Sequence, residues 1–325
     1  KDIITLNDEL GFNINMQAMA DIYNNGELSV INNVGYPNPN RSHFRSTDIW
    51  HSASNENQIW QTGWIGRFLD ANCDIEKIKP HQALEVDDTL SLVLKGEKIK
   101  GIAFKNAEIL NLSGKNHIIN STAKNYIPDN NNSNLEFLHK TLSETSQSAD
   151  YIYAKSKIYK SQKIYPQNEF GKSMKTIAEL ICSGSETKVY YLSLSGFDTH
   201  ALQRNIQDRL LKNYSQTIKV FCDDLKQHNL FNDTLILTFS EFGRRVKQNA
   251  SNGTDHGAAN NVYIIGGKLV KTGIINEMPN LSDLNDGDIQ HTIDFRRIYA
   301  TILDKYFNFN HEIVLKNKFQ SLNFI

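Results

Sequence analysis

Three short segments of the chain combine carboxylate, imidazole or guanidinium side chains with a glycine within the segment or just before it. They are residues 198–200, 240–244 and 253–257. Carboxylate oxygens and imidazole nitrogens together form a ligand set that suits zinc, manganese or iron. Glycines beside them let the backbone turn sharply or approach closely. We therefore expect the three segments to form one polar, metal-binding pocket. The candidate metal ligands are Asp198, His200, Glu241, Asp255 and His256.

Each of these residues also has an ordinary structural interpretation. Asp198 could cap the following helix, and Asp255 could form an Asx-turn with Gly257. Glu241 and Arg244 could form a salt bridge. Three such clusters at successive strand ends favour a shared pocket, but the residue types alone leave both interpretations open.

The loop at 38–45 carries a candidate nucleophile because it follows an expected strand and opens an expected helix. A hydroxyl at a helix N-terminus lies in a positive field near free N–H groups, which suits attack on phosphate or sulfate. Ser42 is the best-placed hydroxyl, with Ser46 and Thr47 as alternatives. The structural alternative is that Ser42 only caps the helix. The candidate contacts to a substrate anion are Arg41, Arg45 and Arg244.

Hydrophobic patterns place these segments at the ends of expected strands. Apolar runs predict strands at 28–34, 189–194, 234–239 and 262–265. Amphipathic periodicity predicts helices at 14–24, 172–182, 205–227 and 294–307. Their order predicts a mostly parallel α/β sheet that is covered on both faces. In such a sheet, ligands bind beyond the carboxyl ends of the strands.

Composition is that of an ordinary globular protein. The 325 residues carry a net charge of -1, which gives no indication of nucleic-acid binding. No apolar run is long enough for a transmembrane helix. We interpret residues 1–325 as a single domain, in which residues 80–165 form an approximate insertion or cap. Three widely spaced cysteines match no metal or disulfide pattern and are expected to be small buried residues. They are Cys73, Cys182 and Cys222.

Five longer stretches support a family resemblance. They are NNVGYPNPNRSHFRSTDIW (32–50), GFDTHALQ (196–203), TFSEFGRR (238–245), GTDHGAANNVYIIGG (253–267) and GDIQHTIDFRRIYATIL (287–303). Their order over nearly the whole chain resembles the uncharacterised bacterial family catalogued as domain of unknown function 1501. That family is grouped with the alkaline-phosphatase-like superfamily, which includes sulfatases and phosphomutases. The resemblance implies a three-layer α/β/α sandwich. It also implies export by a twin-arginine signal to the periplasm or cell surface.

The resemblance assigns roles to individual residues. The superfamily uses two metal ions and a serine or threonine nucleophile, whose place Ser42 would take. Asp198 and His200 would resemble an Asp–His ligand pair. His256, alone or with Asp255, would resemble a late histidine ligand.

Three features of the chain depart from the superfamily pattern. Glu241 stands where an aspartate is usual, and the spacing of Asp198 and His200 is shorter. The early strand that would supply a further aspartate ligand is not found in residues 1–325, either because the sequence starts after it or because this chain has lost it. The resemblance implies a hydrolase of phosphate or sulfate esters that uses divalent ions such as zinc or manganese. The alternative is a non-catalytic exported protein for binding or surface assembly, with a small anionic or glycan-like ligand.

Overall fold

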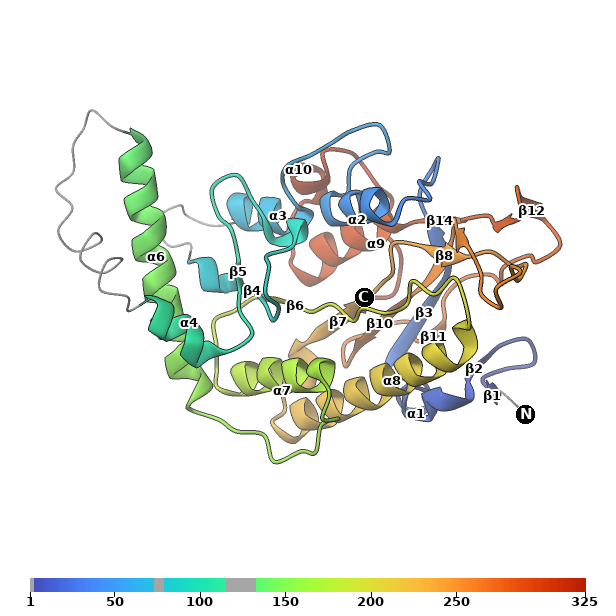
Figure 1. Ribbon diagram of the computed structural model, residues 1–325, viewed down its shortest axis with the longest axis horizontal. Coiled ribbons are helices and arrows are strands. Elements are labelled where there is room, and N and C mark those ends of the chain that lie inside the picture. The colour runs from blue at the N-terminus through green and yellow to red at the C-terminus, as the bar shows by residue number, and fades with distance from the viewer. Residues whose placement is uncertain (1–2, 73–78, 115–132) are drawn as a thin grey trace.

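A mixed sheet of five strands lies at the centre of the computed structural model, which describes residues 3–72, 79–114 and 133–325. Its order is β11–β3–β10–β7, and β14 also pairs with β3. The strands are β3 (Leu28–Gly35), β7 (Leu235–Thr238), β10 (Asn260–Gly266), β11 (Gly273–Ile274) and β14 (Ile293–Asp294). The protein therefore has a mixed α/β structure (Figure 1).

Strand direction differs from the expected mostly parallel arrangement. β10 runs antiparallel to both β3 and β7, whereas β11 and β14 run parallel to β3. After β7 the chain returns to the sheet through short strands and loops at 239–259, without a crossover helix. An antiparallel neighbour needs no such crossover. The described residues therefore form no clear three-layer parallel sandwich.

Helices pack on both faces of the central sheet, because residues along a strand point to opposite sides. In β3, Leu28 and Val30 belong to one buried cluster, and Ile31 and Val34 belong to another. The first cluster is completed by α1 (Gln17–Asn24), α7 (Glu169–Cys182) and α8 (Gln203–Gln227). The second is completed by α2 (His43–Ser52), α3 (Trp64–Asn72), α9 (Phe295–Thr301) and α10 (His311–Leu315). Figure 1 shows the first group below the sheet and the second above it.

The expected helices are present because their apolar spacing matches the helical repeat. In α8, Tyr214, Ile218, Phe221 and Leu225 recur on one face and are buried. The expected helix at 14–24 divides into a 3-10 turn, η1 (Ile14–Met16), followed by α1. The expected helix at 294–307 divides into α9 and a π-helix, η5 (Ile302–Tyr306).

A second sheet has three parallel strands in the order β5–β4–β6. Its strands are β4 (Ala83–Glu85), β5 (Ile102–Ala103) and β6 (Val189–Tyr191). The strand expected at 189–194 therefore ends at Tyr191 and joins this sheet rather than the central one. Beyond Tyr191 the chain continues without regular structure to Asp198.

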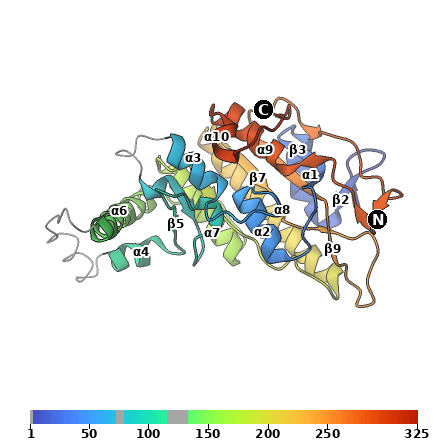
Figure 2. The same ribbon diagram turned by 90° about the horizontal axis from the view of Figure 1, so that it is seen from above.

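The range 80–165, expected to be an insertion, contains elements with different positions. β4 is the middle strand of the three-stranded sheet. By contrast, α4 (Ala107–Gly114) and α6 (Ser133–Ser156) lie at one end of the molecule. Figures 1 and 2 show these two helices at the opposite end from β8 (Gly243–Arg244) and β9 (His256–Gly257). Whether the range forms a separate cap stays a prediction.

Two further observations concern the described residues. None of their helices combines the length and apolar character needed to cross a bilayer. Cys182 and Cys222 are both free thiols, and only Cys222 is fully buried. Cys73 lies outside the described residues.

Candidate functional site

Two of the polar segments, at 240–244 and 253–257, lie at one end of the strands of the central sheet, whereas the segment at 198–200 follows β6 of the other sheet. Asn260, at the start of β10, pairs with Val34 near the end of β3. Tyr263 pairs with Thr238 at the end of β7. The chain therefore leaves β3 and β7, and enters β10, at the same edge. β3 and β7 run in the same direction, so their carboxyl ends meet as expected, and the antiparallel β10 adds the segment that precedes it.

Arg244 joins the three segments to one another. In the sheet β8–β9, Arg244 pairs with His256. Its guanidinium donates hydrogen bonds to the backbone oxygens of Thr254, at 2.6 Å, and Phe197. Burial lowers its pKa, against the opposing effects of Asp198 and the aspartate at 255. The guanidinium of Arg244 was expected to contact a substrate anion. Its N–H groups instead hold the three segments together.

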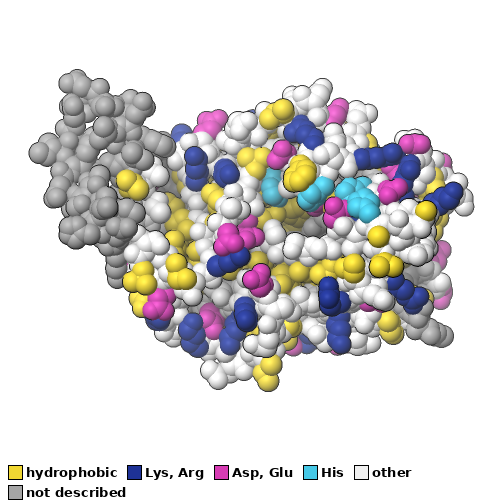
Figure 3. All heavy atoms as spheres, in the orientation of Figure 1, with side chains coloured by type: hydrophobic (Ala, Val, Ile, Leu, Met, Phe, Trp, Pro, Cys, Tyr) yellow, Lys and Arg dark blue, Asp and Glu magenta, His cyan; other side chains and the backbone are white. Residues whose placement is uncertain are grey.

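Two histidines converge on one carboxylate oxygen. Oδ1 of Asp198 lies 2.6 Å from Nε2 of His256 and 2.9 Å from Nε2 of His200. One ligand atom from each residue lies within 4.8 Å of the others. The side chains of Asp198 and His200 are 48% and 49% exposed, so solvent reaches them, whereas that of His256 is 10% exposed. We call these three residues the Asp–His–His triad. Figure 3 shows histidine side chains beside an acidic side chain on this face.

The second nitrogen of each triad histidine faces an acceptor. Nδ1 of His256 lies 3.1 Å from the carbonyl oxygen of Arg41, and Nδ1 of His200 lies 3.4 Å from Oδ1 of Asp255. Histidines that bind metals usually donate their other N–H to a carbonyl or carboxylate in this way. Asp255 therefore lies outside the triad and contacts the outer nitrogen of His200.

The hydrogen bond between His256 and the carbonyl oxygen of Arg41 determines which ring nitrogen of His256 carries a hydrogen. A carbonyl oxygen only accepts hydrogen bonds, so Nδ1 of His256 carries its hydrogen. In a neutral ring, Nε2 then directs a lone pair at the negatively charged oxygen of Asp198. A second ring proton between the two atoms makes this contact favourable, and a metal ion bound by both atoms would take the place of that proton and hold the atoms further apart.

The expected ligand Glu241 is engaged elsewhere. Its carboxylate pairs with Nδ1 of His43, and its backbone oxygen accepts a hydrogen bond of 2.5 Å from Ser46. Glu241 therefore attaches the segment after β7 to the first turns of α2. It forms neither the expected salt bridge with Arg244 nor part of the Asp–His–His triad.

Ser42 lies at the N-cap of α2, next to the triad. Its side chain makes no capping hydrogen bond, in contrast to the structural alternative. Its neighbour Arg41 contacts His256 through the backbone. The other candidate hydroxyls are used internally: Ser46 lies 3.0 Å from the Tyr36 hydroxyl, and Thr47 donates to the His43 backbone.

Comparison with known proteins adds one finding. A family model described as "Protein of unknown function (DUF1501)" matches residues 27–319. The chain belongs to this family. No curated protein and no solved structure matches the chain. The relation to the alkaline-phosphatase-like superfamily therefore stays a prediction.

Two residues that matter in this DUF1501 protein were missed from the sequence. Phe242 stacks on the ring of His256, with centroids 4.1 Å apart and planes 7° apart, and so restricts rotation of that ring. His43 pairs with Glu241. Both residues are direct neighbours of named candidates, and their only sequence signal was membership of the same short motifs.

The two remaining arginines of this DUF1501 protein bind other parts of the chain. Arg45 donates to three backbone oxygens of the loop at 55–58. Arg41 pairs with Asp286 at 2.8 Å and Asp288 at 3.2 Å, and the hydrogen bond that it donates to Asp286 is the largest cause that raises the pKa of Arg41. Neither guanidinium points into the triad as an unpaired cation.

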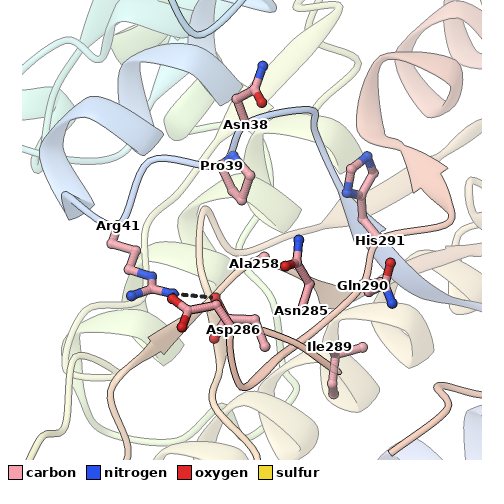
Figure 4. A pocket seen from close by; sticks show the side chains of 10 residues that line it. Asn38, Pro39, Arg41, Ala258, Asn285, Asp286, Ile289, Gln290 and His291 are labelled. Atoms are coloured by element: carbon pink, nitrogen blue, oxygen red, sulfur yellow. Dashed lines mark hydrogen bonds and ion pairs between the residues drawn. The ribbon is translucent and has the colours of Figure 1, made fainter. Parts of the chain in front are cut away.

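The side chain of Arg41 lines a pocket of about 420 Å³ (Figure 4). Its walls combine the amide side chains of Asn38, Asn285 and Gln290 with charged and apolar side chains. His291 also lines it, and burial lowers the pKa of that imidazole. The triad residues do not line this pocket, so it adjoins the site through Arg41 rather than enclosing it.

Proposed function

We propose that this DUF1501 protein is a metal-dependent hydrolase of phosphate or sulfate esters. Asp198, His200 and His256 would bind a divalent cation such as zinc or manganese, and Ser42 would be the nucleophile. The observation that carries the proposal is the convergence of two Nε2 atoms on one carboxylate oxygen. Each ring is oriented by an acceptor at Nδ1.

The donor set fits such an ion. Two neutral imidazoles and one carboxylate form a set found in zinc sites and in other divalent-metal sites. Exposure of Asp198 and His200 leaves room for water or substrate at the remaining positions. When bound, the cation would lower the pKa of a nearby hydroxyl and offset charge on the transferring group.

The remaining chemistry would use the start of α2. The Ser42 oxygen would attack phosphorus or sulfur and form a covalent ester with it, while the bond to the substrate alcohol breaks and the alcohol leaves with a proton. Water would then cleave the serine ester. The N-terminus of α2 would stabilise the negative group through its free N–H groups.

The finer fold assignment is part of the same proposal. Helices on both faces of the central sheet support an alkaline-phosphatase-like arrangement. The antiparallel β10 is a departure from it. We also propose export to the periplasm or cell surface, on the family resemblance.

The test is turnover of p-nitrophenyl phosphate and p-nitrophenyl sulfate by the protein loaded with zinc or manganese. We expect measurable hydrolysis, loss of it in Ser42→Ala, and retention of metal in that variant. The matched control is Ser113→Ala, which removes an exposed hydroxyl on α4 and should leave turnover unchanged. Equal turnover in Ser42→Ala and wild type would refute the assigned nucleophile.

A second candidate is a metal-binding protein without turnover, which binds an anionic or glycan-like ligand. The observation that favours the absence of turnover is that Arg41, Arg45 and Arg244 all bond to other parts of the chain and so do not offset charge on a transferring group. This reading expects stoichiometric metal with no hydrolysis of either ester class.

A further inference from the structure

A second group of metal-ligand side chains lies where α7 and α8 end. Cys182 is the last residue of α7, Asp224 lies in the last turn of α8, and His228 directly follows α8. One ligand atom from each lies within 4.8 Å of the others. The opposite end of α8, at Gln203, bonds to Thr254 next to the Asp–His–His triad. Because α8 has 25 residues, it spans about 37 Å and separates the two groups.

Asp224 is a fully buried carboxylate whose hydrogen-bond donors are neutral hydroxyls. They belong to Tyr159 at 3.1 Å, Ser161 at 2.5 Å and Tyr165 at 2.9 Å. In the part of the chain that the structure describes, no lysine or arginine pairs with Asp224. A buried charge is costly unless a counter-charge accompanies it. The environment of Asp224 therefore favours an added cation.

Two lysines of neighbouring segments, Lys155 and Lys160, bind groups other than Asp224. Lys155 donates to the carbonyl oxygens of Ser183 and Gly184 just beyond α7. Lys160 pairs with Glu179 at 2.7 Å. Among the described residues, no lysine or arginine therefore balances the negative charge of Asp224.

The possible metal-ligand atoms of Cys182, Asp224 and His228 are of kinds that bind zinc. Cys182 and His228 are half-buried, so an ion could enter from solvent, and Asp224 closes the inner side. Nε2 of His228 lies 2.8 Å from the Tyr159 hydroxyl, which itself contacts Asp224. Sulfur, nitrogen and carboxylate oxygen are the three kinds of atom that zinc binds in proteins.

We propose that Cys182, Asp224 and His228 bind a zinc-type divalent cation, with Tyr159 or water at the fourth position. The bound ion would join the C-terminal ends of α7 and α8. Burial, followed by the charge of Asp224, raises the pKa of the Cys182 thiol to about 11. Binding at neutral pH would therefore form a sulfur–metal bond and release the thiol proton to solvent. This site is independent of the function proposed for the triad.

Cobalt(II) distinguishes this site from the triad, because only a thiolate ligand gives a near-ultraviolet sulfur-to-cobalt charge-transfer band. The titration uses the full chain with His256→Ala, which removes a triad ligand. We expect the band to saturate at one cobalt per chain and to disappear when Cys182→Ala is added. The matched control is Cys222→Ala, which removes the buried thiol of α8 that lies outside the Cys182–Asp224–His228 group, and the band should persist.

A second measurement needs no substitution. Zinc should protect Cys182 of the wild-type protein from alkylation by iodoacetamide, as read by peptide mass spectrometry. We expect protection at about stoichiometric zinc and its loss on adding a chelator. Absence of the cobalt band in folded protein, or equal alkylation with and without zinc, would overturn the proposal and leave a hydrogen-bonded Asp224 network only.

Discussion

Nε2 of His256 lies 2.6 Å from Oδ1 of Asp198, while Nδ1 of the same ring donates to a backbone carbonyl. The imidazole thus lies between a backbone carbonyl oxygen, which only accepts hydrogen bonds, and the carboxylate oxygen of Asp198, whose negative charge needs a cation beside it. His200 approaches the same oxygen from a second direction. This geometry is the basis for placing a metal ion at the Asp–His–His triad.

Asp255→Asn should weaken metal binding without abolishing it. Asp255 orients His200 through Nδ1, and loss of such an outer carboxylate typically costs about 10–100-fold in metal affinity. Zinc affinity measured by competition with a chromogenic chelator checks this. Asp283→Asn, an exposed aspartate remote from the triad in sequence, is the control and should bind zinc as tightly as wild type. A complete loss of zinc in Asp255→Asn would instead make Asp255 a direct ligand.

Glu241→Gln should leave zinc affinity at the triad unchanged, because Glu241 pairs with His43. The variant should lower the free energy of unfolding by about 1 kcal/mol, since one partner of a partly buried ion pair is lost. His43→Gln should have a similar effect. Chelator competition and urea unfolding measure the two quantities. A large fall in zinc affinity would return Glu241 to the ligand set.

Trp50→Ala should destabilise the protein by about 3–5 kcal/mol, the usual cost of removing a large buried aromatic side chain. Trp50 stacks on Phe295 and Phe239, at centroid distances of 4.3 and 5.1 Å. It lies on α2, so its loss should also disturb the helix that carries Ser42. Urea unfolding gives the free energy. A change below about 1 kcal/mol would show that α2 packs without this contact.

Acid pH should remove a stabilising contribution of Asp198. The hydrogen bond with His256 is the largest cause that lowers the pKa of Asp198 below its ordinary value of 3.8. A lowered folded-state pKa gives stability that is present above pH 3.8 and lost as pH falls through the folded-state value. The metal-free wild type should therefore lose stability faster than Asp198→Asn in this range. Parallel acid dependence of the two proteins, measured by urea unfolding at several pH values, would contradict the pairing.

The sequence predicted the positions of most helices and strands, but not the direction of the strands. Apolar spacing in α8 and the continuous burial of β3 follow from side-chain patterns within one element. Whether β10 runs parallel or antiparallel to β3 depends on contacts between distant segments. A hydrophobic pattern contains no such information.

The same limit applies to the site. Asp198, His200 and His256 were named from the sequence because their residue types suit metals. His43 was not named as the partner of Glu241, because their pairing depends on how α2 packs against the segment after β7. Phe242 was missed for a related reason: its contact with His256 requires the pairing of β8 with β9.

The most direct test is elemental analysis of the full chain purified with zinc and without chelators, in wild type and His256→Ala. Both proteins should also be measured with Cys182→Ala, so that metal at the second site does not count. In that background, we expect at least one equivalent of zinc with the intact triad and one equivalent less in His256→Ala. Equal zinc content in the two proteins would contradict a metal ion at the Asp–His–His triad.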